Sequence, residues 1–265
     1  MTFWQVMTIE ARKRMSYRAD FWLGAILGLG AQIGICIFLA LAIFRESGSE
    51  RIGEYTVRGM VLYYVVVQLV AKIVRSTEME MGVSQDIYEG GLTRYLLYPT
   101  SYGLFKYAQQ LGALAPSLIQ VLLLGAWVPF VFAGEAEVTL ASAVMCLAAI
   151  AVANVLYFLL GTVIQLVAFW ADNVWSLMVA NRIAAALFGG FMIPLSLFPP
   201  WARAILAWTP FPYLFAFPLD ALFGRLSPAD WARGMGLALG WCGGVAILGK
   251  ILWRRGMIQY TGVGI

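Results

Sequence analysis

The sequence predicts an all-α protein that crosses a membrane with six helices, and three observations carry this prediction. Hydrophobic residues make up 62% of the chain, and charged residues make up only 12%, about half the charged share of ordinary soluble domains. The apolar runs extend over about 20 residues, the length that a helix needs to cross a bilayer. They lack the alternation over about ten residues that marks a transmembrane β-barrel.

Six apolar runs are long enough to be membrane-spanning helices. They are residues 21–44, 55–74, 107–132, 140–170, 174–193 and 231–252. The fourth run holds 31 residues, more than a bilayer needs, so we expect it to bend, tilt or protrude. The chain shows no internal repeat and no low-complexity linker, which predicts a single domain over residues 1–265.

Two further segments are apolar in part and do not read as spans. Residues 1–20 can wind into a helix with Trp4, Met7 and Met15 on one face and basic residues beside it, which predicts a helix lying on an anionic membrane surface. A frayed basic tail is the alternative. Residues 194–230 contain seven prolines, too many for a spanning helix, and are too apolar for a solvated loop. We expect short helices there, either half-sunk in the interface or re-entering the membrane.

The basic residues predict the orientation. In the predicted topology, eleven Lys and Arg residues lie on the same side of the membrane as the N-terminus. Six lie on the opposite side, and Arg182, within the fifth run, is not counted. Because cytoplasmic segments carry the excess of Lys and Arg, both ends of the chain and the loop over residues 84–106 are predicted to be cytoplasmic. The net charge of +4 is not gathered into a stripe, which suits lipid headgroups and argues against a nucleic-acid partner.

The sequence offers no catalytic or metal site. Histidine is absent, which removes the commonest general base and the commonest metal ligand. The three cysteines lie in separate apolar runs, without metal-ligand spacing. No glycine-rich phosphate loop occurs, because the pair Gly90 and Gly91 is followed by no lysine where a phosphate cradle needs one. We therefore expect a chain that is not itself an enzyme and binds no cofactor of its own.

Polar residues inside the apolar runs are the next candidates. Asn181 and Arg182 lie near the middle of the fifth run, where a guanidinium is costly unless it faces protein, a carboxylate or a watery cavity. They predict either a cavity that takes a polar or anionic substrate, or a structural hydrogen-bonding role on a helix that begins later. The remaining polar residues are expected to form hydrogen bonds between helices. These are Gln32, Gln68, Gln120, Asn154 and Gln165.

The loop over residues 84–106 is the segment best placed to meet a soluble partner. Residues 86–97 can form one short amphipathic helix, with Tyr88 and Leu92 on one face and Asp86 and Arg94 on the other. Asp86 could cap this helix, with Glu89 three residues later in the position of a capping box. The alternative is an ordinary interfacial loop, because two adjacent glycines weaken a helix interior by about 1 kcal/mol each.

This loop resembles that of permease subunits of type-2 ATP-binding-cassette transporters. The likeness lies in residues 87–99, IYEGGLTRYLLYP, similar to a family pattern of an isoleucine, a glycine, spaced leucines and a closing proline. A second likeness lies in residues 193–199, IPLSLFP, followed by Pro210 and Phe211. The sequence departs from the family at Tyr98, where a basic residue often precedes the proline, and this puts an electrostatic contact at that position in doubt.

The resemblance implies an exporter permease of the cell inner membrane. It implies a second permease, identical or related, and two cytoplasmic ATPase subunits that bind ATP and Mg. It further implies that the loop holds a coupling helix resting on the ATPase and that the second and fifth spans face the dimer axis, which would place Gln68, Asn181 and Arg182 along the pathway. The coupling residues would be Asp86, Ile87, Tyr88, Glu89, Leu92 and Arg94.

Two other functions remain open at this point. A stand-alone channel or secondary transporter would be expected to use intramembrane carboxylates or helices broken at mid-depth. A membrane-embedded enzyme, such as a lipid-modifying transferase, would gather polar catalytic groups at one interface. The sequence shows no such cluster, although residues 194–230 could contain one.

Overall fold

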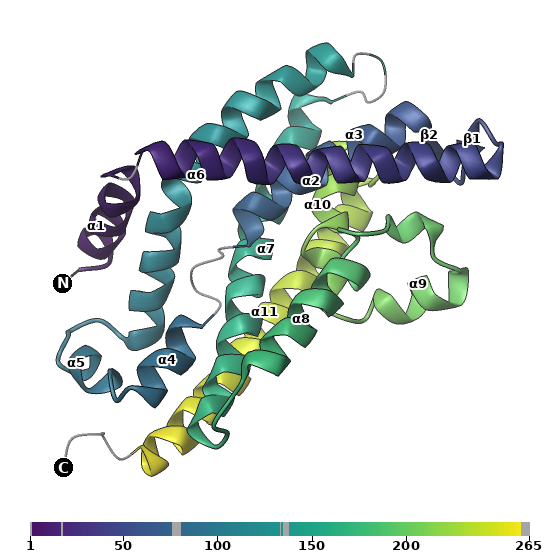
Figure 1. Ribbon diagram of the computed structural model, residues 1–265. Coiled ribbons are helices and arrows are strands. Elements are labelled where there is room, and N and C mark those ends of the chain that lie inside the picture. Colours follow the sequence, from purple (N-terminus) through teal and green to yellow (C-terminus); the bar gives the residue numbers. More distant parts are fainter. Residues whose placement is uncertain (1, 17, 76–80, 133, 135–137, 261–265) are drawn as a thin grey trace.

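The computed structural model describes residues 2–16, 18–75, 81–132, 134 and 138–260, and most of them are helical (Figure 1). The first half contains helices α1 (Phe3–Ser16), α2 (Arg18–Ser47), α3 (Val57–Val74), α4 (Gly82–Tyr88), α5 (Leu92–Leu96) and α6 (Tyr102–Val131). The second half contains α7 (Leu140–Gln165), α8 (Trp175–Phe188), α9 (Pro200–Leu206), α10 (Ala216–Leu222) and α11 (Pro228–Gln259). Between α2 and α3, β1 (Arg51–Ile52) and β2 (Tyr55–Thr56) form a small antiparallel hairpin.

Five helical segments in the described part of the chain are long and apolar enough to cross a membrane. They are Gly30–Ser47 within α2, Val57–Val74, Tyr102–Val131, Leu140–Phe169 and Pro228–Gln259. The prediction of an all-α membrane protein is therefore confirmed in outline. The overlong fourth run ends its α-helix at Gln165 and tightens into a 3₁₀ turn over Leu166–Phe169.

The fifth predicted run forms a helix shorter than a span. Helix α8 has 14 residues and is about 21 Å long at 1.5 Å per residue, less than the hydrocarbon core of about 30 Å. Its last residue is Phe188 and its C-cap is Gly189, and Gly190 follows with φ of 86°, a left-handed conformation that glycine adopts without strain. Gly190 also lies against Ala216, so the chain turns there to place α10 inside the fold.

The proline-rich segment forms short helices, as predicted, but at two different depths. Helix α9 exposes Trp201 and Ile205, and Trp208 in the turn after it is exposed as well. These apolar and amphipathic side chains suit a membrane interface. Helix α10 is buried by contrast, with Leu219 and the N-cap residue Phe215 fully inaccessible, and it packs against α3 and α7. The segment thus combines an exposed helix with one that enters the protein interior.

The main core surrounds α3, the most buried of the candidate spans. It packs against α2, α6, α7 and α10, and its tyrosines tie it to the turn after α8. The hydroxyl of Tyr64 donates to the carbonyl of Met192 at 3.0 Å, and that of Tyr63 donates to the carbonyl of Gly190. These bonds satisfy backbone acceptors where α8 has ended.

A second cluster lies at the end of the molecule where α1, α4, α5 and the C-terminal end of α11 come together (Figure 1). We call it the loop cluster. Its buried members are Val6, Val83, Ile87, Leu92, Tyr95, Tyr102, Phe105, Ala108, Leu166, Ala168 and Val174. Trp253 and Tyr260 of the C-terminal region pack against it, and the Trp253 ring stacks on Tyr102 with centroids 4.9 Å apart.

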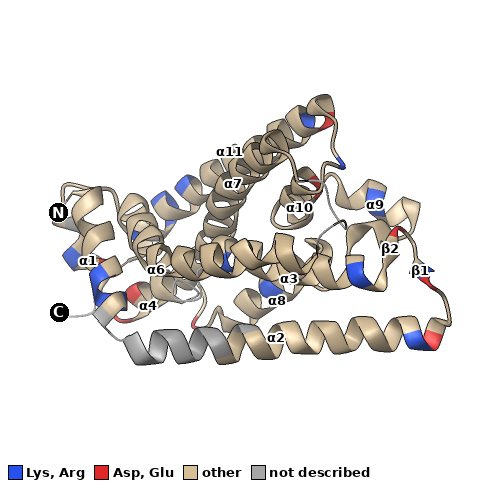
Figure 2. Ribbon diagram, turned by 90° about the horizontal axis from the view of Figure 1, so that it is seen from above, with Lys and Arg blue, Asp and Glu red and all other residues tan. Residues whose placement is uncertain are grey.

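The predicted N-terminal helix is present as α1, which packs against α6. Val6 is buried in the loop cluster, whereas Trp4 and Met15 are exposed. Figure 2 shows that charged residues gather at two ends of the molecule, one with α1 and α4 and the other with the hairpin and α9. Between these ends the helices are mostly uncharged, as expected for a protein embedded in a bilayer.

Candidate functional site

The predicted helix over residues 86–97 is wrong in form, because the structure has two short helices there. Helix α4 begins at Gly82 and ends at Tyr88, and α5 runs from Leu92 to Leu96. Gly90 between them has φ of 71°, which a right-handed helix cannot contain. We call residues 82–96 the α4–α5 element.

Asp86 neither caps a helix nor faces solvent, contrary to the prediction. It lies inside α4, whose N-cap position is Met81, and its side chain is only 9% exposed. Its carboxylate lies 2.5 Å from Lys106 Nζ, accepts from the Tyr102 hydroxyl at 2.8 Å and lies 3.4 Å from an Arg94 nitrogen. Asp86 can be buried because these two cations and the hydroxyl group supply the charge and hydrogen-bond partners that a buried carboxylate needs.

Lys106 fixes this element to α6. Its side chain is 6% exposed, and besides pairing with Asp86 it donates to the carbonyl of Gly82 at 3.2 Å. Both contacts lie on α4, at its first residue and one turn later. The ion pair is therefore a clamp between the start of α6 and the loop that precedes it. The pairing of Lys106 with Asp86 was not predicted, although a lysine at the start of an apolar run and a lone aspartate in the preceding loop are the signal for such a pair.

Gln165, at the end of α7, caps the other side of α4. Its Oε1 accepts from the backbone N–H of Val83 at 2.8 Å and of Ser84 at 3.3 Å, two donors in the first turn that have no partner inside the helix. Its Nε2 donates to the carbonyl of Gly161 at 3.3 Å. The predicted interhelical hydrogen bond of Gln165 is thus confirmed, and it links α7 directly to the α4–α5 element.

The six predicted coupling residues divide into two groups. Asp86, Ile87 and Leu92 are buried, and Tyr88 is half-buried with its hydroxyl donating to the carbonyl of Ala171 at 2.9 Å. Glu89 and Arg94 are exposed. The inward residues hold the element in place, whereas Glu89 and Arg94 lie on its exposed side.

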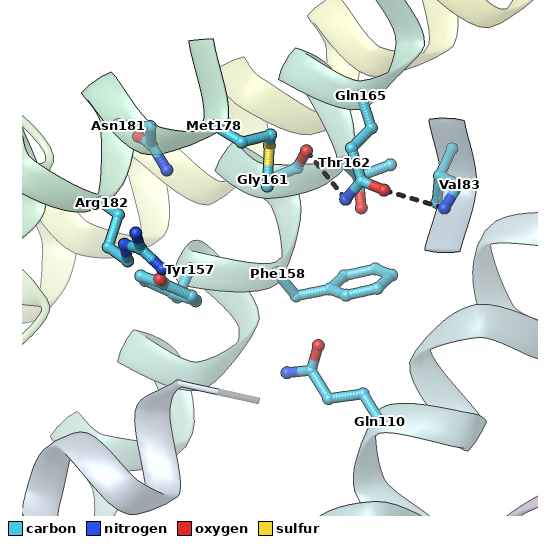
Figure 3. A pocket seen from close by; sticks show the side chains of 10 residues that line it. All are labelled: Val83, Gln110, Tyr157, Phe158, Gly161, Thr162, Gln165, Met178, Asn181 and Arg182. Atoms are coloured by element: carbon cyan, nitrogen blue, oxygen red, sulfur yellow. Dashed lines mark hydrogen bonds between the residues drawn. The ribbon is translucent and has the colours of Figure 1, made fainter. Parts of the chain in front are cut away.

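Asn181 and Arg182 line a small cavity that also includes Val83 of α4 (Figure 3). Its volume is about 30 Å³, room for about one water molecule. Val83, Gln110 and Gln165 line it from other helices, and the Nε2 of Gln110 is buried with no hydrogen-bond partner in the described chain. Several polar side chains line the cavity, but most of its surface is apolar, and in this conformation it is too small for a substrate larger than water.

A family model described as ABC-2 family transporter protein matches residues 30–264. The chain belongs to the ABC-2 transporter family. Comparison with curated proteins and with solved structures gave no match. The resemblance of the sequence to type-2 ATP-binding-cassette permeases is thereby confirmed.

Gln68 is not among the residues that line the cavity of Asn181 and Arg182 in this ABC-2 permease. It is buried on α3, and its Nε2 lies 3.6 Å from Cys36 Sγ on α2. The structure therefore brings two of the three predicted pathway residues together and places the third against another helix. Asn154 and Gln120 behave as expected for interhelical bonds, since Asn154 donates to the carbonyl of Ile73 at 2.9 Å and Gln120 accepts from Lys72.

The permease also has a polar cluster that was not predicted from the sequence, at the end opposite to the α4–α5 element. Arg225 donates to the Tyr55 hydroxyl at 2.7 Å and lies 3.5 Å from Asp220. Glu54 and Arg203 share with them the lining of a cavity of about 300 Å³. Burial raises the pKa of Asp220 to about 6, against the opposing effect of Arg225.

This pKa predicts a dependence of stability on pH. The native state holds the Asp220 proton more tightly than the unfolded chain, where an aspartate has a pKa of about 3.9. Its contribution to the free energy of unfolding is therefore full below about pH 4 and is lost as the pH rises through about 6. Asp220→Asn mimics the protonated side chain, so we expect its melting temperature to equal the wild type's at pH 4 and exceed it at pH 7.

Melting followed by tryptophan fluorescence in detergent, from pH 4 to pH 7, measures this difference. Asp172→Asn, which changes an exposed aspartate, is the matched control and should track the wild type throughout. A constant difference between Asp220→Asn and wild type at all pH values would contradict the assignment.

Proposed function

We propose that this chain is the membrane-spanning permease of an ATP-driven exporter and that the α4–α5 element docks on a cytoplasmic ATPase subunit. One observation carries the proposal: the element is fixed on its inner side by Lys106, Gln165 and the loop cluster. Its outer side presents Glu89, Thr93 and Arg94. An element held so firmly transmits a displacement to α6 and α7 instead of absorbing it.

ATP and Mg in this proposal are bound by the partner ATPase subunits, since the sequence holds no phosphate loop. ABC-2 permeases generally work with such subunits. The α4–α5 element lies beside both ends of the described chain, and the excess of Lys and Arg on that side supports a cytoplasmic placement in the cell inner membrane.

A second permease, identical or related, completes the pathway in our proposal. Arg182 is exposed on α8, and a charge exposed in a membrane-embedded helix is costly unless another protein surface or a watery cavity covers it. We further propose that α8 together with residues 189–193 forms a sixth membrane-embedded segment, in addition to the five long helices. Asn181 and Arg182 would then face the substrate, and Gln68 would join them only after α2 moves.

Charge reversal at Glu89 tests the docking role. We expect Glu89→Arg to lower transport-linked ATP hydrolysis by about tenfold, because a mismatched charge at an interface costs on the order of 1.4 kcal/mol or more. Arg94 is a less suitable position, because it also contacts Asp86 and the Tyr95 hydroxyl. The measurement is ATP hydrolysis by the complex reconstituted in vesicles, together with the amount of ATPase that co-purifies.

Glu46→Arg is the matched control. It reverses an exposed glutamate near the end of α2 away from the α4–α5 element (Figure 2), and its activity should equal that of the wild type. Full transport by the isolated permease without any ATPase subunit would overturn the proposed function.

A further inference from the structure

A wide groove runs along the outside of the helix bundle next to the α4–α5 element. It encloses about 870 Å³ between the start of α6, the second half of α7 and the second half of α11. Its walls are almost entirely apolar or aromatic. Representative lining residues are Leu104, Tyr107, Phe158, Leu159, Val163 and Val245.

The end of the groove nearest the C-terminal end of α11 is basic, and we call this end the mouth. Lys250 and Arg254 both line it and, four residues apart on α11, share a helix face. Both are exposed, and neither forms an ion pair with any residue in the ranges that the structure describes. Ser101, which precedes α6 and makes no side-chain cap bond, lies in the same lining. The mouth therefore offers two cations to an anionic group.

The length of the groove matches one leaflet of a bilayer. On α11 its lining extends from Val245 to Arg254, a rise of about 14 Å at 1.5 Å per residue. Half of a hydrocarbon core of about 30 Å is about 15 Å. The basic mouth thus lies at headgroup level when the apolar walls lie in the acyl region.

We propose that this groove binds an anionic phospholipid of the membrane leaflet on the same side as the α4–α5 element. Its phosphate lies between Lys250 and Arg254, and an acyl chain fills the space along α7 and α11. An apolar helix of a second chain would fit the walls but would leave both cations without a partner. A bound lipid contacts Tyr95 and Tyr98, which also line the groove, so it supports the α4–α5 element from the side.

Lipid retention by the full-length permease tests this inference, independently of ATP coupling. The protein is stripped of lipid in detergent, mixed with micelles containing equal amounts of phosphatidylglycerol and phosphatidylcholine, and examined by native mass spectrometry. We expect preferential retention of phosphatidylglycerol. Arg254→Gln should lower that retention about fivefold, the effect of one basic residue near an anionic lipid surface.

Arg255→Gln is the matched control, because Arg255 is exposed on a neighbouring face of α11 and lines a different hollow, with Trp170. It should leave retention unchanged. Leu104→Trp, at an exposed groove position, should lower the retention of both lipids by filling the groove while the melting temperature stays that of the wild type.

Four results would overturn the inference. Equal retention of the two lipids would remove the role of the cations, and equal losses in Arg254→Gln and Arg255→Gln would show a non-specific surface charge. Displacement of phosphatidylglycerol by inorganic phosphate would show an anion site without a lipid groove. A dimer that Leu104→Trp dissociates would instead identify the occupant as a second copy of the chain.

Discussion

Lys106→Met is expected to destabilise the native state by about 3–5 kcal/mol, because it leaves the carboxylate of Asp86 buried without its main partner. The two side chains are 6% and 9% exposed and 2.5 Å apart. Tyr102 and Arg94 retain their contacts with Asp86, but Arg94 is mostly exposed and cannot replace a buried ammonium. We expect α4 to detach from α6 and ATPase binding to be lost with it.

The free energy of unfolding, measured by denaturant titration in detergent with tryptophan fluorescence, checks this result. Lys13→Met is the matched control, since Lys13 is 68% exposed and pairs with Glu10 at 3.5 Å, a surface pair contributing no more than about 1 kcal/mol. The double variant Lys106→Met with Asp86→Leu should recover most of the loss, because no charge is then left buried. Equal losses at Lys13 and Lys106 would show that burial does not determine the effect.

Gln165→Leu is expected to have the second largest effect. It leaves the N–H groups of Val83 and Ser84 without their acceptor, and each buried donor left unsatisfied costs about 1–3 kcal/mol. Helix α4 has only seven residues, so losing the cap of its first turn should unfold it locally and weaken ATPase docking. Hydrogen exchange at the Val83 and Ser84 amides reports this directly, with faster exchange expected in the variant.

Gln165→Glu separates loss of the acceptor from loss of side-chain shape. Glutamate keeps an oxygen at the position of Oε1, so exchange at the two amides should stay closer to that of the wild type than in the leucine variant. If Gln165→Leu left both amides as protected as in the wild type, the cap would have no part in holding α4.

The long helices could be predicted because hydropathy averaged over about 20 residues depends on the local sequence alone. The division of residues 86–97 into two helices could not, although the signal was present in Gly90. A period of 3.6 placed Tyr88 and Leu92 on one helix face, but the left-handed backbone at Gly90 changes the direction of the chain between them. A helical period applied along the sequence assumes one continuous helix and therefore does not predict this change of direction.

The inward position of Asp86 depended on tertiary structure in the same way. A pattern that places charged residues outward assigns an aspartate to the exposed face, whereas Lys106 and Tyr102 hold it inside. For Gln165 the hydrogen bond between helices was predicted correctly, but its partner was not. That partner, the start of α4, lies 82 residues away in the sequence. Asn181 and Arg182 were predicted together because they are adjacent in the sequence, while Gln110 joins their cavity only through folding.

The loop cluster has a consequence for the order of biosynthesis. Trp253 of α11 stacks on Tyr102 and also contacts the Phe169 ring edge-on at 6.0 Å, so α11 closes the packing behind α4 and α5. Helix α11 leaves the ribosome after all the other described helices. The α4–α5 element therefore acquires its full support only when the last long helix is made. An ATPase subunit that docks on this element, as we propose, would bind only to chains in which α11 has already been synthesised.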